Sequence, residues 1–208
     1  MTNLKEFVGE REPVDYLLNP EEKFAVGPYA VSDYYMESRK AQAHAMENAK
    51  QVILDVAKDF EKISGRKYGL IEEYKMDDAE YAMVIIGSAA GTAKEAVDEM
   101  REAGKKVGII KIRSFRPFPG EEIATSLKKA VAVMDRCESF STNGGPVGAE
   151  TMQAMYTNGC TAKAINIMYG IGGRDVTVGD MRGVYDTLEE IAKTGETGPT
   201  YRYMGLRD

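Results

Sequence analysis

The 208-residue sequence has no tryptophan, only two cysteines and only one histidine. Cys137 and Cys160 lie far apart in sequence, so this chain alone cannot supply a disulfide framework, a CxxC zinc site or a four-cysteine iron–sulfur site. His44 falls in a strongly helical stretch, which favours a surface or packing role over metal binding or acid–base chemistry. We therefore expect no metal site here, and we expect any cluster to lie on a partner.

The sequence also lacks an excess of positive charge, because it has 27 Lys and Arg and 33 Asp and Glu, for a net charge of −6. Such a chain lacks the positive surface that nucleic acids or anionic membranes would require. No apolar run reaches the roughly 18 residues of a membrane-spanning helix, and the first residues lack the apolar stretch of a signal peptide. We expect a cytoplasmic protein without a nucleic-acid or membrane partner.

The chain contains 43% apolar and 29% charged residues, the composition of an ordinary globular protein. Prolines and glycines punctuate residues 1–31, which predicts an extended arm. Residues 32–63 contain neither, and they predict one long helix with Ser32 as its N-cap. Apolar residues recur along this helix at spacings of three and four, which predicts one buried stripe. The helix and a connector together make residues 32–78.

Residues 79–208 alternate apolar strand patterns with helical ones, which predicts an α/β domain. The order of elements predicts a three-layer α/β/α arrangement around a mostly parallel sheet. We predict strands at 81–86, 106–112, 131–134 and 163–169, and helices at about 91–103, 120–130, 149–156 and 178–194.

Ligands of open parallel sheets bind beyond the carboxyl ends of the strands, so the loops after the strands are the places to look. The first loop, 87–94, joins a strand to a helix start, where anions are favoured. Only three residues separate Gly87 from Gly91, and Lys94 is displaced, so the spacing matches no Walker loop. We favour a tight packing turn over phosphate binding.

The second loop, 111–120, combines arginines, phenylalanines and prolines, the residue types that anchor interfaces. Arg113, Phe115, Arg116 and Phe118 are therefore predicted interface residues. The alternative is that Arg113 and Arg116 clamp a phosphate or carboxylate.

Two further loops complete this set. Gly144 and Gly145 approach another helix start and are predicted interface residues, with Glu150 placed to serve the helix dipole or a capping bond. Arg174 is also a predicted interface residue, and a mutual ion pair with Asp175 would explain both side chains. Because no nucleophile, base and orienting group converge, we predict no catalytic, cofactor-binding or metal-ligating residue.

Several long segments resemble one family in the same order. They include GRKYGLIEEYKMDDAE, IKIRSFRPFPGEEI, VMDRCESFSTNGGPVGAE and YGIGGRDVT. From about residue 27 to 208 the sequence resembles the end of the alpha subunit of pyruvate (2-oxoacid):ferredoxin oxidoreductases, also called pyruvate synthases. The resemblance implies that residues 79–208 form a domain like the carboxy-terminal domain of transketolase.

The resemblance also implies a complex that uses thiamine diphosphate, coenzyme A and [4Fe–4S] clusters. Such a complex oxidises pyruvate to acetyl-CoA and reduces ferredoxin, or runs the reverse reaction. The family's catalytic residues lie in a thiamine-pyrimidine-binding domain that this sequence does not contain. We therefore expect a structural and assembly part, inactive alone, whose partners are the other subunits, with a homodimer contact possible. The alternative is a stand-alone α/β module that binds an anionic nucleotide such as coenzyme A, and an independent hydrolase is disfavoured.

Overall fold

The computed structural model describes residues 4–10, 20–21, 27 and 29–207. The chain divides into two compact units, Met1–Tyr68 and Gly69–Asp208. The sequence placed this boundary after residue 78. In the structure the connector from Gly69 belongs with the α/β unit, because it supplies an edge strand of the sheet.

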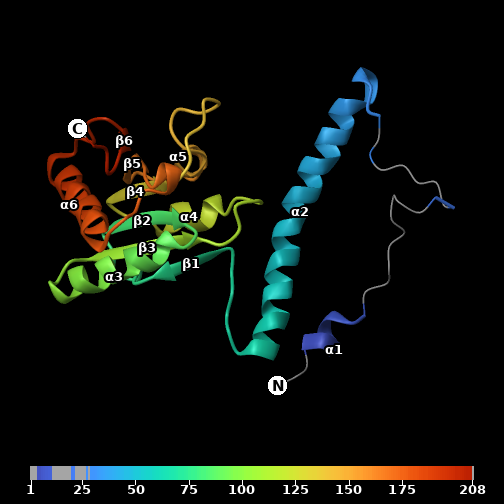
Figure 1. The fold of residues 1–208 in the computed structure, drawn as a ribbon, viewed down its shortest axis with the longest axis horizontal. Coiled ribbons are helices and arrows are strands. Elements are labelled where there is room, and N and C mark those ends of the chain that lie inside the picture. The colour runs from blue at the N-terminus through green and yellow to red at the C-terminus, as the bar shows by residue number, and fades with distance from the viewer. Residues whose placement is uncertain (1–3, 11–19, 22–26, 28, 208) are drawn as a thin grey trace. The chain divides into compact units, whose positions relative to one another are not determined.

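The first unit contains α1 (Leu4–Val8) and α2 (Ser32–Ser64), drawn in blue to teal in Figure 1. At Leu4–Val8 the prediction of an extended arm is wrong, since no glycine or proline interrupts these five residues. Gly9, with φ of 72°, ends the turn and donates its N–H to the Lys5 carbonyl at 2.9 Å. Most of the remaining predicted arm lies outside the described residues.

The long helix α2 confirms the prediction made for residues 32–63. Its N-cap is Val31, without a side-chain hydrogen bond, so the predicted cap at Ser32 is wrong by one residue. Gly65 ends the helix in the left-handed conformation and donates to the Glu61 carbonyl at 2.8 Å. No residue of α2 is buried, and Val52 and Val56 are more than half exposed. The predicted buried stripe is therefore present in the sequence but not covered by the described part of this chain.

The second unit is built on one six-stranded sheet. Its strands are β1 (Ile71–Tyr74), β2 (Tyr81–Ile86), β3 (Val107–Ile112), β4 (Ala130–Asp135), β5 (Lys163–Met168) and β6 (Tyr201–Tyr203). Their order across the sheet is β1-β3-β2-β4-β5-β6. Only β1 runs antiparallel to its neighbour, and the other pairs are parallel. The prediction of a mostly parallel sheet is confirmed.

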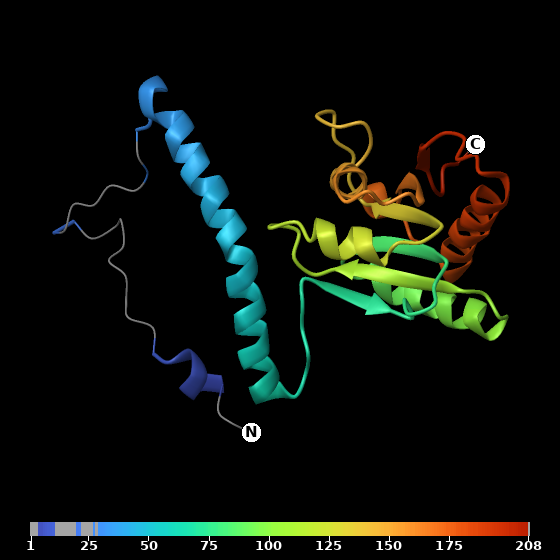
Figure 2. The same cartoon turned by 180° about the vertical axis from the view of Figure 1, so that it is seen from behind.

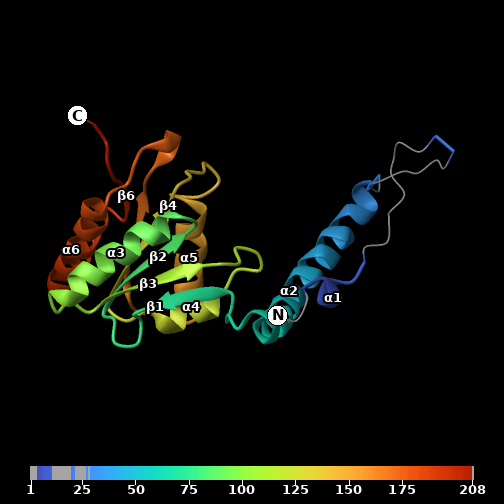
Figure 3. The ribbon, with the colours of Figure 1, turned by 60° about the horizontal axis from the view of Figure 1, so that its bottom comes forward.

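Helices cover both faces of this sheet, as Figures 1 and 3 show. They are α3 (Ala89–Glu102), α4 (Gly120–Ser126), α5 (Pro146–Thr157) and α6 (Val178–Thr194), with a short 3-10 turn η1 at Ile171–Gly173. α3 contacts α6 on one face, and α4 contacts α5 on the other. Two apolar cores fill the spaces between sheet and helices, because the central strands bury side chains on both faces. The three-layer prediction is confirmed.

The sequence predicted neither edge strand, β1 nor β6. Both are short, with the sequences IEEY and YRY, and neither shows the apolar run of a buried strand. They exist because the exposed backbone of the neighbouring strand supplies their partners, for example Glu72 opposite Lys111 and Arg202 opposite Ile167. The helix predicted to reach residue 130 ends at Ser126, since the chain turns there to enter β4.

The two edges of the sheet differ in what they present. The carboxyl rim is formed by the loops that follow β2, β3, β4 and β5, at residues 87–88, 113–119, 136–145 and 169–177. The amino rim is formed by the connectors that lead into these strands. The chain leaves β2 for β3 on one side of β2 and then crosses to β4 on the other side. The gap between the loops after β2 and β4 is therefore the topological switch point, where ligands of such sheets bind.

Candidate functional site

The β4–α5 connection at the carboxyl rim is fixed by a buried carboxylate. Asp135, the last residue of β4, accepts hydrogen bonds from the N–H groups of Val147 at 3.0 Å and Gly148 at 2.8 Å. These N–H groups belong to the first turn of α5, so Asp135 caps the helix and meets the positive end of its dipole. An anion from solution cannot take this place, because the chain's own carboxylate fills it.

Asn166, in the middle of β5, hydrogen-bonds to the same carboxylate, and we call this buried network of Asp135, Asn166 and the start of α5 the lock. The Asn166 amide oxygen accepts from the N–H of Gly145 at 2.8 Å, and its amide nitrogen donates to Asp135 at 2.8 Å and to the Val133 carbonyl at 2.9 Å. All these groups are buried, so each hydrogen bond also avoids the cost of an unsatisfied polar group. An asparagine inside the apolar part of the strand KAINIM was the available sequence signal.

The glycines of this loop are required by the same lock. A Cβ at Gly145 would lie 2.1 Å from the Asp135 side chain, and one at Gly144 or Gly148 would lie 2.5 Å or less from the Asn166 amide. Gly144 and Gly145 were predicted as interface residues, but both are buried against their own chain. Their internal packing explains them.

The β3–α4 loop holds its predicted interface residues in internal contacts. Arg116 pairs with Glu150 at 2.6 Å, and Arg113 pairs with Glu72. Phe115 and Phe118 meet edge to face, with ring centroids 6.0 Å apart, and pack partly against the core on the α4/α5 face.

These pairs bear on two sequence interpretations. The alternative that Arg113 and Arg116 clamp an anionic ligand is not supported, because a carboxylate of this chain already meets each guanidinium. Glu150 does not cap α5 but forms an ion pair with Arg116. Asp135 provides the cap.

A cavity of about 270 Å³ lies at the switch point of the carboxyl rim. Arg136 Nε donates to the Gly170 carbonyl at 3.0 Å, and an Arg174 guanidinium nitrogen donates to the Gly205 carbonyl. The predicted ion pair between Arg174 and Asp175 is not formed, and the Arg174 guanidinium instead meets the Gly205 carbonyl. The cavity is lined by Ser88, Ala89, Thr92, Arg136, Tyr169, Gly173, Arg174, Asp175 and Val176.

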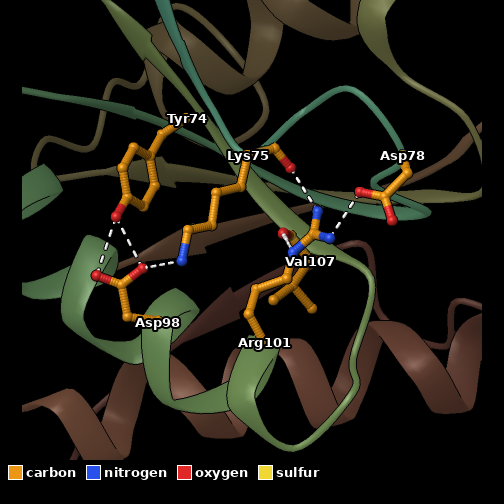
Figure 4. Close-up of polar contacts among 6 residues, drawn as sticks. All are labelled: Tyr74, Lys75, Asp78, Asp98, Arg101 and Val107. Atoms are coloured by element: carbon orange, nitrogen blue, oxygen red, sulfur yellow. Dashed lines mark hydrogen bonds and ion pairs between the residues drawn. The ribbon is translucent and has the colours of Figure 1, made fainter.

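At the amino rim, Asp98 of α3 ties the end of β1 to the helix (Figure 4). The Tyr74 hydroxyl donates to both of its oxygens, at 2.7 and 2.9 Å, and the Lys75 ammonium donates to one of them. The hydrogen bond from Lys75 holds the pKa of Asp98 below its ordinary value, and Tyr74 adds to this effect. The hydrogen bond between Tyr74 and Asp98 raises the pKa of Tyr74.

Arg101, one turn later in α3, fixes the connector between β1 and β2 (Figure 4). Its guanidinium donates to the Val107 carbonyl at 2.7 Å, to the Lys75 carbonyl at 2.5 Å and to the Asp78 carboxylate at 2.6 Å. Arg101 thereby lowers the pKa of Asp78. Because this rim carries the amino ends of the strands, we assign the network to stability and not to ligand binding.

The residue types of this chain do not fit an iron–sulfur cluster. Four thiolates are needed, whereas Cys137 follows β4 at the carboxyl rim and Cys160 precedes β5 at the amino rim. Among the described residues no three His, Cys, Asp or Glu side chains gather in a metal-binding arrangement. His44 is exposed on α2, 3.7 Å from Glu47. No described helix is long and apolar enough to cross a membrane.

Comparison with protein families gives a match over most of the α/β unit. Residues 79–181 match the pyruvate:ferredoxin oxidoreductase core domain II. This part of the chain belongs to that family. The match begins just before β2 and ends inside α6, so it contains both the lock at Asp135 and the cavity of the carboxyl rim.

Individual oxidoreductase subunits extend this similarity. The chain is 40% identical to pyruvate synthase subunit PorA of Thermotoga maritima, over 99% of this chain and 52% of that protein. It is also 40% identical to ketoisovalerate oxidoreductase subunit VorA of Pyrococcus abyssi, over 97% and 52%. A solved 2-oxoglutarate:ferredoxin oxidoreductase from Magnetococcus marinus aligns with a TM-score of 0.48 and 15% identity, over 85% of this chain and 28% of that one. The chain spans about half the length of the curated relatives it matches.

Proposed function

We propose that this chain is a structural and assembly part of a thiamine-diphosphate-dependent 2-oxoacid:ferredoxin oxidoreductase, and that it is inactive alone. The similarity to PorA over 99% of the chain carries this proposal. Pyruvate is the proposed substrate of the complex, since several relatives at about 40% identity are pyruvate synthase subunits. The ketoisovalerate relative is as similar, so identity alone does not select the 2-oxoacid.

The arrangement of polar groups supports a non-catalytic role. A catalytic centre needs a nucleophile, a base and an orienting group within reach of one another. The buried carboxylate of the carboxyl rim, Asp135, is committed to the first turn of α5. Thiamine diphosphate, coenzyme A and the clusters would then be held by other parts of the complex.

The carboxyl rim is the proposed contact with the rest of the complex. Its β4–α5 loop projects from the α/β unit (Figure 2), and Phe140 on this loop is fully exposed. Sequence reasoning missed Phe140, although a large aromatic side chain on a glycine-rich loop is a usable signal. The β3–α4 loop of the same rim carries the predicted residues Arg113, Phe115, Arg116 and Phe118, and aromatic and arginine side chains are the common anchors of interfaces. Arg174 lines the cavity and is left out of this surface.

The proposed partner is the polypeptide that corresponds to the half of the relatives' length not spanned here, including the thiamine-pyrimidine-binding domain. Co-expression of this chain with that polypeptide and the remaining subunits should give one complex that reduces a viologen dye when pyruvate and coenzyme A are added. The purified chain alone should reduce none. Dye reduction by the chain alone would refute the proposal, as would a complex that assembles and turns over fully without it.

A matched pair of variants tests the contact surface. Phe140→Ser removes an exposed aromatic ring at the carboxyl rim, and Tyr156→Ser removes another highly exposed ring near the carboxyl end of α5. We expect Phe140→Ser to weaken subunit affinity by about 30-fold, the value of a hot-spot aromatic, and Tyr156→Ser to leave it unchanged. Equal affinities in the two variants, measured by surface plasmon resonance, would place the contact elsewhere.

A further inference from the structure

The first turn of α3 differs from the other helix starts in the α/β unit. Ser88, its N-cap, makes no side-chain capping bond, and the first turn contains no acidic residue. The N–H groups of Ala89 and Ala90 have no hydrogen-bond acceptor within the described residues. Carboxylates stand at the amino ends of the other three helices: Asp135 for α5, Asp180 for α6, and Glu121 and Glu122 for α4. The first turn of α3 thus contains no carboxylate of its own to meet the helix dipole.

Tyr169 gives an independent indication of a ligand. The residue is only 3% exposed, and its ring packs in the core on the α3/α6 face. It lines the cavity beside Ser88 and Ala89, and its hydroxyl makes no hydrogen bond to a described residue. The hydroxyl oxygen itself remains accessible, so a ligand that enters the cavity can accept its hydrogen bond.

Two arginines give the cavity its charge. Arg136 uses Nε for the Gly170 carbonyl, and Arg174 uses one terminal nitrogen for the Gly205 carbonyl. These bonds hold both side chains in place and leave other guanidinium N–H groups available. Asp175 is the one carboxylate in the lining, so the lining carries one net positive charge.

We propose that this cavity binds a phosphoryl group, with the α3 amino end, the Tyr169 hydroxyl and the guanidinium groups of Arg136 and Arg174 as donors. A phosphate dianion accepts several hydrogen bonds at once and matches guanidinium geometry. The volume of about 270 Å³ is below the range of about 300 Å³ and more that encloses whole small-molecule ligands, so only the phosphoryl group would be seated. The missing Walker spacing does not oppose this site, because side chains from two other loops supply the charge.

The test is a titration of the full chain with inorganic phosphate, followed by amide chemical shifts in two-dimensional NMR. Sodium chloride keeps the ionic strength constant, so that general screening is excluded. We expect saturable shifts confined to residues 87–92, 135–137 and 169–176, with a dissociation constant of about 1 mM. The absence of saturation, or shifts scattered over the surface, would overturn the proposal.

Variants sharpen the assignment. Arg174→Gln should weaken phosphate binding about tenfold, the loss of one charge-assisted contact. Tyr169→Phe keeps the buried ring and should weaken binding about threefold, whereas Asp175→Asn should strengthen it about threefold. Arg182→Gln is the matched control, because Arg182 is an exposed arginine on α6 paired with Glu99, and it should bind as the unaltered chain does. Equal losses in Arg174→Gln and Arg182→Gln would overturn the site.

The source of the phosphoryl group is decided by comparing inorganic phosphate with glycerol 3-phosphate. Tighter binding of the ester would identify a phosphorylated metabolite as the natural ligand, and equal or weaker binding would identify free phosphate. This inference goes beyond the proposed function and does not depend on it. The titration uses no partner subunit, so its failure would leave the assembly proposal standing.

Discussion

The two rims of the sheet differ in how far the hydrogen-bond donors of their arginines are satisfied within the chain. At the amino rim, the Arg101 guanidinium donates to Val107, Lys75 and Asp78 of the same chain (Figure 4). At the carboxyl rim, Arg136 and Arg174 each use part of their guanidinium groups. Paired groups hold a fold together, whereas groups with spare donors beside a cavity are available to a ligand.

Within the carboxyl rim, the layer next to the sheet also differs from the outer layer. The layer next to the sheet is as fully paired as the amino rim, because Asp135 and Asn166 satisfy each other and the start of α5. Only the outer layer, with Phe140 and the cavity, is exposed and can contact a partner or a ligand. A rigid base therefore carries an adaptable surface, the arrangement that gives precise binding at low ordering cost.

The largest effect should come from breaking the base of the carboxyl rim. Gly145→Ala places a Cβ 2.1 Å from the Asp135 side chain, where neither the strand nor the helix can yield freely. We expect the free energy of unfolding to fall by about 3 kcal/mol, measured by urea denaturation.

Gly183→Ala is the control for that change. Gly183 lies inside α6, and a Cβ added there would meet no neighbouring atom within 4 Å outside the backbone of the helix itself. Because alanine favours the helix more than glycine does, Gly183→Ala should raise the free energy of unfolding by about 1 kcal/mol. If Gly145→Ala and Gly183→Ala shifted stability in the same direction, the lock would not have the rigidity described above.

A smaller loss should follow from opening the amino rim. Arg101→Ala removes three hydrogen bonds and should lower the free energy of unfolding by about 2 kcal/mol. Subunit affinity and phosphate affinity should be unchanged, since the network lies at the other edge of the sheet. Arg182→Ala, which breaks the exposed pair with Glu99, should cost less than about 1 kcal/mol. A loss of subunit or phosphate affinity in Arg101→Ala would contradict the division between the rims.

The smallest effect concerns pH. The pKa of Asp98 is held below its ordinary value of 3.8, chiefly by Lys75, so its contribution is complete above that value. The contribution is lost as pH falls through the lowered pKa of the folded state. Urea midpoints between about pH 6 and pH 2 should therefore decline less steeply in Asp98→Asn than in the unaltered chain. Parallel declines would show that other carboxylates govern acid stability.

Much of the α/β unit was readable in advance. The runs YAMVII and KAINIM are apolar enough to require a strand buried on both faces, and the glycines between elements mark the turns. The strand β6 was missed because YRY has no such run and is specified by the backbone of β5. For α2 the pattern predicted a helix correctly, but apolar periodicity says only that a surface is needed and not which polypeptide supplies it.

For the candidate site, sequence reasoning pointed to the carboxyl rim, and the structure shows that several residues it named make contacts within their own chain. Gly144 and Gly145 were visible, yet their cause lies in Asp135 and Asn166, which other strands bring to them. Arg113 and Arg116 looked available until Glu72 and Glu150 were found beside them. Tyr169 carries no sequence signal, because burial and the lack of a partner are properties of its surroundings.

The sequence by itself determined the order of the central strands β2 to β5 and the helices between them, the parallel sheet and the family, because periodicity and motif order are local and survive without coordinates. Tertiary structure alone decided which polar groups are hydrogen-bonded within the chain and which keep donors that a ligand could use. That division depends on which residues distant in sequence meet, as Asp135 meets Gly148 and as Arg136, Tyr169 and Arg174 meet around one cavity. Hydrogen-bond satisfaction is a property of neighbours in space, and the order of residues along the chain does not contain it.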